Sequence, residues 1–124
     1  MTVPENVPAR ADLPGRADFL LLAEVGNMSE TRVRWRVRFW GQVQHVGFRY
    51  TALYLARKLY LTGWVKNFSD GTELQEAQGS TAQLRKLLIQ LKSQPHLHIT
   101  QYAIDLIPLQ PYERGFRVIN GNTE

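Results

Sequence analysis

The residues with the clearest potential for chemistry form one short stretch, Gly41 to Arg49, with the sequence GQVQHVGFR. This stretch predicts the end of a strand, a turning loop, and an arginine on the first turn of a helix. The first turn of a helix has backbone N–H groups without intrahelical partners and carries the positive end of the helix dipole. Arg49 adds a planar, permanently charged guanidinium suited to phosphate or carboxylate. We therefore expect this loop to hold an anion, and specifically a phosphoryl group.

The elements on either side of the loop must position it. From Arg32 onward the sequence alternates strictly between apolar residues and arginines, and a period of two predicts a half-buried strand. We expect the arginine side of this strand to face water. After the loop, apolar residues spaced as on one helix face predict an amphipathic helix over about 48–60, with Gly63 marking a stop or turn nearby. The alternating apolar residues are Val33, Trp35, Val37 and Phe39, and the helical ones are Ala52, Leu55, Ala56 and Leu59.

The sequence after Gly63 predicts further strands and a second helix. Strands are expected at 64–67 and 72–78, joined by the Asp70-Gly71 turn, although neither face of the second strand is clearly apolar. Ser80 and Gln83 have capping-box spacing and open a helix that Pro95 must end. Strands at 99–107 and, more briefly, 115–119 complete the chain. The order β-α-β-β-α-β predicts an α+β, ferredoxin-like sandwich, in which two helices cover one face of an antiparallel sheet.

Composition restricts the function further. The 124 residues support one domain, no window of about 18 apolar residues predicts a membrane span, and cysteine is absent. A chain without cysteine fits a reducing compartment, so we expect a cytoplasmic protein. Residues 1–30 are acidic and proline-containing and are expected to be a disordered extension, leaving residues 31–120 as the folded domain. Translation that starts at Met28 would remove most of this extension.

No metal or cofactor is expected. His96 and His98 are the only pair that suggests a metal, but no third ligand is identifiable from spacing.

Several separated motifs together resemble the acylphosphatase family. That family has the loop pattern G-x-V-Q-G-V-G-F-R, followed by G-W-V-x-N and D-G. Here the matching runs are residues 41–49, Gly63 to Asn67 and Asp70-Gly71, with Gln78-Gly79 and the run 113–116 adding to the likeness. The resemblance covers about residues 32–119 and preserves the order of the motifs.

The resemblance implies metal-independent hydrolysis of an acyl phosphate to a carboxylate and inorganic phosphate. It assigns Arg49 to the phosphoryl oxygens and Asn67 to the orientation of the attacking water. It also assigns the phosphate cradle to the backbone N–H groups of five loop residues. These substrate-binding residues are Gln44, His45, Val46, Gly47 and Phe48. We expect the enzyme to be monomeric.

The chain departs from the family pattern in two places. His45 replaces the second loop glycine, and its Cβ is a difficulty if the position needs a positive φ. We nevertheless expect activity to survive. Glu73 and Gln75 stand where the family has apolar, core-facing residues, which we expect to affect local stability rather than chemistry.

Two other functions remain as alternatives. A basic ferredoxin-like domain can bind RNA or another polyanion through its sheet, but residues 72–78 have neither the aromatic nor the basic residues of such a surface. The domain also resembles the acylphosphatase-like segment of larger carbamoyl-transferring maturation factors. We expect a stand-alone enzyme and do not expect nucleic acid as a partner.

Overall fold

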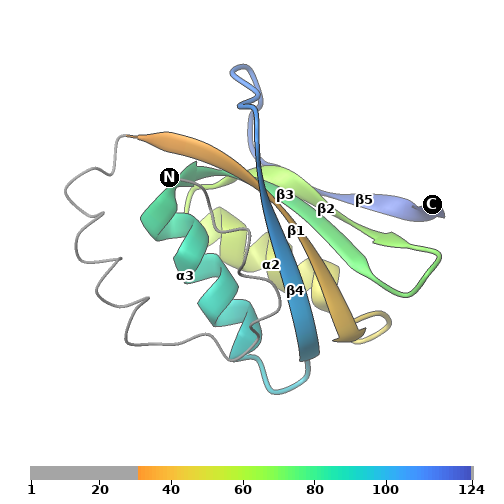
Figure 1. The fold of residues 1–124 in the computed structure, drawn as a ribbon. Helices are drawn as coiled ribbons and strands as arrows, with labels where there is room; N and C mark the ends of the chain where they lie inside the picture. The colour runs from red at the N-terminus through yellow and green to blue at the C-terminus, as the bar shows by residue number, and fades with distance from the viewer. Residues whose placement is uncertain (1–30, 124) are drawn as a thin grey trace.

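The computed structural model describes residues 31–123, with side chains described as far as Asn120. Its elements follow the predicted order, including the short strand expected at the C-terminal end (Figure 1). They are β1 (Arg32–Gln42), α2 (Phe48–Lys58), β2 (Thr62–Phe68), β3 (Glu73–Ser80), α3 (Thr81–Lys92), β4 (His98–Ile107) and β5 (Phe116–Thr123). The fold class is confirmed as α+β and ferredoxin-like.

The strands form one five-stranded sheet in the order β4-β1-β3-β2-β5. Neighbouring strands are antiparallel except for β2 and β5, which run parallel, so the sheet is mixed. Helices α2 and α3 lie on the same face of this sheet (Figure 1). The apolar sides of the helices and of the sheet pack together there, and no helix within the described residues covers the opposite face of the sheet.

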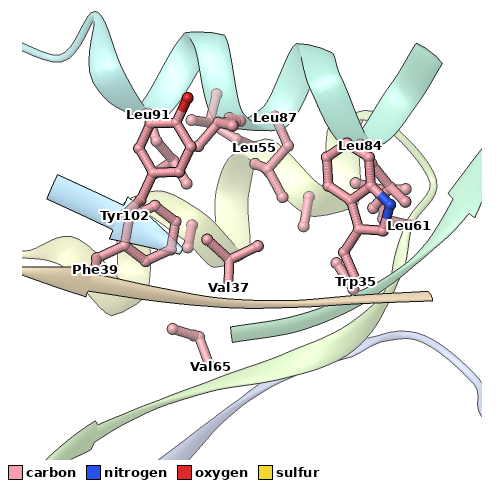
Figure 2. Packing of buried hydrophobic residues seen from close by; sticks show 14 of the residues in the cluster. Trp35, Val37, Phe39, Leu55, Leu61, Val65, Leu84, Leu87, Leu91 and Tyr102 are labelled. Carbon is pink, nitrogen blue, oxygen red and sulfur yellow. The ribbon is translucent and has the colours of Figure 1, made fainter. Parts of the chain in front are cut away.

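The core lies between the helices and the apolar side of β1. Trp35, Val37 and Phe39 are at most 3% exposed, as the alternation predicts. Figure 2 shows them packed below Leu84, Leu87 and Leu91 of α3 and beside Leu55 of α2. The predicted capping box at Ser80 and Gln83 is present at the start of α3. This packing fixes β1 and α2, and therefore the two ends of the loop between them.

Strand β3 occupies the centre of the sheet, which explains its ambiguous sequence. It pairs with β1 on one side and β2 on the other, and every residue from Glu73 to Ser80 is buried. Its polar side chains are therefore buried rather than solvated. One side of β3 faces the helices and the other forms part of the outer face of the sheet.

The prediction that the arginine side of β1 faces water is wrong for Arg34, which is 2% exposed. Its guanidinium pairs with Glu76 at 3.0 Å and with Glu113 at 2.8 Å. Arg36 is half-exposed and binds the same Glu76 at 2.9 Å. The β4–β5 connection that contains Glu113 therefore covers part of the outer face. Because of this cover, the charged side chain of Arg34 is buried.

Two local predictions around the end of the first helix need correction. The helix ends at Lys58 rather than near Tyr60, and Tyr60 itself takes a left-handed φ of 60°. Gly63 is not a stop signal but a residue of β2 with a φ of 145°. A Cβ at Gly63 would collide with the carbonyl oxygen of Glu76 on β3. The glycine is needed for close strand approach.

No helix within the described residues is long and apolar enough to cross a membrane. The expected extension and the possible start at Met28 lie outside the described residues.

Candidate active site

The loop between β1 and α2 ends in an open helix N-terminus. Gly47 is the N-cap with a φ of 86°, no side chain caps α2, and no acidic residue lies in its first turn. The N–H of Thr51 donates to the Gly47 carbonyl at 3.0 Å, which is the first turn of the helical ladder. The N–H groups before Thr51 belong to the unpaired end of the helix. This end can accept an anion without displacing an internal acidic cap.

His45 adopts the backbone conformation that raised concern in the sequence. Its φ is 66°, in the left-handed region, and its side chain is exposed. Histidine is among the residues that populate this region more often than most non-glycine residues. The loop therefore keeps a left-handed residue at this position, and the exposed imidazole lies beside the loop rather than inside the core.

Gln44 fixes the loop to the neighbouring hairpin through its side chain. Its Nε2 donates to the carbonyl oxygen of Phe68 at 2.7 Å and to that of Thr72 at 2.9 Å. Both acceptors belong to the β2–β3 hairpin, so the amide joins two segments that are far apart in the sequence. Only the backbone of Gln44 had been assigned a role from the sequence.

Val46 in the loop and Phe48 at the start of α2 attach the loop to the hydrophobic core. Phe48 is 1% exposed, and its ring lies 4.9 Å from that of Phe39 on β1. Val46 is partly buried and packs against the same core. Their apolar side chains are directed into the protein, which leaves the polar backbone of the loop as the candidate binding surface.

The β2–β3 hairpin has its own internal support. The Asp70 carboxylate accepts from the Thr72 N–H at 3.0 Å and from the Thr72 hydroxyl at 2.7 Å, and these hydrogen bonds lower the pKa of Asp70. Arg38 donates to the same hydroxyl at 2.7 Å, and its guanidinium lies 4.8 Å from the centre of the Phe68 ring. The hairpin is thus a firm attachment point for Gln44.

Arg49 lies on the first turn of α2, as predicted, and reaches toward β5. Its Nη1 is 3.2 Å from Oδ1 of Asn120 and 3.5 Å from the Ile119 carbonyl oxygen. Both acceptors are uncharged. Within the described part of the chain, no carboxylate forms a direct ion pair with this guanidinium.

Asn67 and Glu73 lie directly opposite each other across β2 and β3. Glu73 also pairs in register with the core residue Phe39, which places its side chain on the helix-covered face of the sheet. The Oδ1 of Asn67 and the Oε1 of Glu73 are both buried without a hydrogen-bond partner in the structure. Burial raises the pKa of Glu73 to about 7, although the charge of Arg49 acts to lower it.

Arg49, Asn67 and Glu73 therefore occupy one neighbourhood. The sequence had suggested a structural effect for Glu73, but it gave no sign that this carboxyl stands against Asn67 and within the field of Arg49. The register of β2 and β3 places it there. Asn120 was also missed, because it lies beyond the stretch in which a terminal strand was expected.

His96 and His98 have different surroundings in the structure. Within residues 31–123, no three His, Cys, Asp or Glu side chains are grouped as metal ligands. His98 belongs to β4 rather than to a loop, and the His96 ring lies 3.1 Å from the Thr51 hydroxyl.

Taken together, the fold and the loop define an α+β, ferredoxin-like domain with an uncapped helix N-terminus after its first strand. Residues 35–118 match the sequence profile of the acylphosphatase family. The chain therefore belongs to the acylphosphatase family and is a hydrolase of that type.

Individual proteins give the same result. An acylphosphatase from Pediococcus pentosaceus is 45% identical over 71 residues, which cover 56% of this chain and 79% of that protein. One from Geobacillus thermodenitrificans is 38% identical over 82 residues, covering 65% of this chain and 87% of the relative. The crystal structure of acylphosphatase from Bacillus subtilis superposes with a TM-score of 0.67 at 29% identity, covering 71% of this chain and 99% of that structure.

Proposed function

We propose that residues 31–120 form an enzyme that hydrolyses acyl phosphates to a carboxylate and inorganic phosphate without a metal. The observation that carries this proposal is the uncapped N-terminus of α2, with left-handed His45 and Gly47 before it and Arg49 on its first turn. The names of the relatives, which are acylphosphatases, supply the substrate class.

The phosphoryl group is held by the loop and by Arg49. Backbone N–H groups from Gln44 to Phe48 donate to its oxygens, and the guanidinium adds two donors in a planar fork. Gln44 and Phe48 keep this loop in place through the hairpin carbonyls and the core. Arg49 exchanges its weak contacts with uncharged acceptors for a charged ligand, so no internal ion pair opposes binding.

Asn67 orients the attacking water. Its side chain projects from β2 on the helix-covered face of the sheet, and its Oδ1 has no hydrogen-bond partner that would hold it elsewhere. An acyl phosphate has a good leaving group, so positioning and charge stabilisation supply most of the acceleration. The substrate phosphate accepts the proton of the water, and no covalent enzyme intermediate is needed.

Polyanion binding through the sheet is less well supported. On the outer face, Arg34 and Arg36 share Glu76, and Arg34 also binds Glu113. Arg38 is engaged with the hairpin through Thr72. Arg34, Arg36 and Arg38 of β1 are thus engaged in ion pairs and hydrogen bonds within the protein. Residues 72–78 contain no aromatic side chain that could stack on a base.

Release of phosphate from benzoyl phosphate in the presence of EDTA tests the proposal. We expect saturable turnover that the chelator does not reduce, and competitive inhibition by inorganic phosphate, because product and substrate share one anion site. Absence of turnover together with tight, salt-sensitive RNA binding would instead select the polyanion-binding alternative.

A further inference from the structure

Glu73 is a buried carboxyl without the partner that such a group normally has. It is 1% exposed, and its Oε1 accepts no hydrogen bond in the structure. Glu76, three residues along the same strand, is also buried but binds two arginines at about 3 Å. Burying a charged carboxylate costs free energy unless the group is paired and hydrogen-bonded. Burial without a partner therefore favours the protonated, neutral form of Glu73.

The surroundings of Glu73 contain one opposing influence. Phe39 on β1 and Asn67 on β2 face it in register, and neither titrates. Arg49 on α2 is the charged group that acts on it, lowering its pKa while burial raises it to about 7. His45 is the other titratable group of the loop, and it is exposed. The charge of Glu73 therefore depends on the balance between its burial, which raises its pKa, and the positive charge of Arg49, which lowers it.

An anion bound at Arg49 changes this balance. It neutralises the guanidinium and places a second negative charge near the carboxylate, in a buried setting where like charges repel strongly. Both effects favour the neutral form of Glu73. Because linkage is reciprocal, an ionised Glu73 must in turn weaken anion binding by the same free energy.

We propose, on the basis of the anion site assigned above, that Glu73 is a positioning residue that takes up one proton from solvent when a tetrahedral dianion binds at Arg49. The neutral acid then donates a hydrogen bond to the unpartnered Oδ1 of Asn67. Directly opposite residues of antiparallel strands have Cβ atoms about 5 Å apart, within reach of both side chains. The Asn67 carboxamide is thereby fixed with its N–H groups toward the site, and the proton returns to solvent when product leaves.

Sulfate is a suitable probe, because it is a tetrahedral dianion that does not titrate between pH 5.5 and 8.5. Calorimetric titration in two buffers of different ionisation enthalpy gives both the affinity and the number of protons taken up. For the unaltered full chain we expect net proton uptake near pH 7.5 and an affinity that falls about tenfold from pH 7 to 8.5. Both follow from the binding of sulfate to the protonated form.

Glu73→Gln keeps the shape and removes the charge. We expect this variant to bind sulfate without the Glu73 proton, to lose most of the pH dependence, and to bind more tightly than the unaltered chain at pH 8.5. Any dependence left in it reports groups other than Glu73. Glu76→Gln, a buried glutamate on the outer face, is the matched control and should keep the original pH dependence.

Sulfate binding with the same proton uptake in the unaltered chain and in Glu73→Gln would overturn this inference. That result would leave the proposed function intact. Absence of sulfate binding at any pH would also overturn it, and benzoyl phosphate hydrolysis measured on the same sample would show whether the proposed function falls with it. Circular dichroism of each variant shows that the comparison is made between folded proteins.

Discussion

The side-chain amide of Gln44 donates to the carbonyl oxygen of Phe68 at 2.7 Å and so ties the candidate phosphate loop to the β2–β3 hairpin. The same amide reaches Thr72 at 2.9 Å. The loop is therefore held from its polar side by the hairpin and from its apolar side by Phe48 in the core. Binding geometry at the loop depends on a residue whose side chain does not need to touch the substrate.

Gln44→Ala should loosen the loop. Loss of two hydrogen bonds is expected to lower the free energy of unfolding by about 1–2 kcal/mol and to raise KM for benzoyl phosphate. Urea denaturation and steady-state kinetics measure the two effects. Gln42→Ala, at an exposed position at the end of β1, serves as the control. Unchanged stability and KM in Gln44→Ala would show that the tie has no role.

Arg49 and Asn67 should differ in the kinetic step that each supports. Arg49→Ala is expected to abolish hydrolysis by weakening phosphate binding, which appears as a loss of competitive inhibition by inorganic phosphate. Asn67→Ala should keep that inhibition and lose turnover, because only the water is affected. If either variant turned over near the normal rate with saturating benzoyl phosphate, its assigned role would be wrong.

His45→Gly tests whether the histidine is tolerated or required. Glycine adopts a φ of 66° without the steric cost that a Cβ brings, so the free energy of unfolding should be unchanged or higher by up to about 1 kcal/mol. Activity on benzoyl phosphate should remain within about tenfold. A larger loss, measured on folded protein, would make the imidazole a participant.

Glu73 should make stability depend on pH in an unusual direction. Its pKa rises from 4.5 to about 7 on folding, so the folded state binds more protons than the unfolded state in this range. Stability therefore falls as pH rises from about 4.5 to about 7 and levels off above it. Glu73→Gln should gain up to about 3 kcal/mol relative to the unaltered chain at pH 8 and nothing at pH 4.5. Equal differences at both pH values in urea denaturation would contradict this.

Glu113 should matter for stability alone. It holds the β4–β5 connection to buried Arg34 at 2.8 Å on the face of the sheet away from the loop. Glu113→Ala is expected to cost about 2 kcal/mol and to leave kcat and KM unchanged. Arg114→Ala, at an exposed neighbouring position, is the comparison variant. A kinetic effect of Glu113→Ala without a loss of stability would place Glu113 in a different role.

Much of the fold was accessible from sequence because local patterns determined it. The alternation in β1 and the Ser80–Gln83 capping box each appear where predicted. Arg49 and Gly47 also occupy the predicted helix start. These features depend on neighbours a few residues apart, which a single sequence displays.

The remaining features depend on contacts between distant segments. Arg34 is buried because Glu113, 79 positions later, covers it. Glu73 meets Asn67 because the register of β2 and β3 places them opposite each other. Gly63 serves strand packing against β3 and not helix termination. No local pattern in the sequence records which residues a sheet brings together.

The most direct test of the phosphoryl site follows backbone amide signals by ¹H–¹⁵N NMR while inorganic phosphate is added. We predict saturable shifts concentrated at residues 44–49, with a dissociation constant that matches the competitive inhibition constant for benzoyl phosphate hydrolysis. Hydrolysis by a protein whose amide signals at 44–49 stay unchanged at saturating phosphate, or shift only elsewhere, would contradict the assignment of this loop as the anion site.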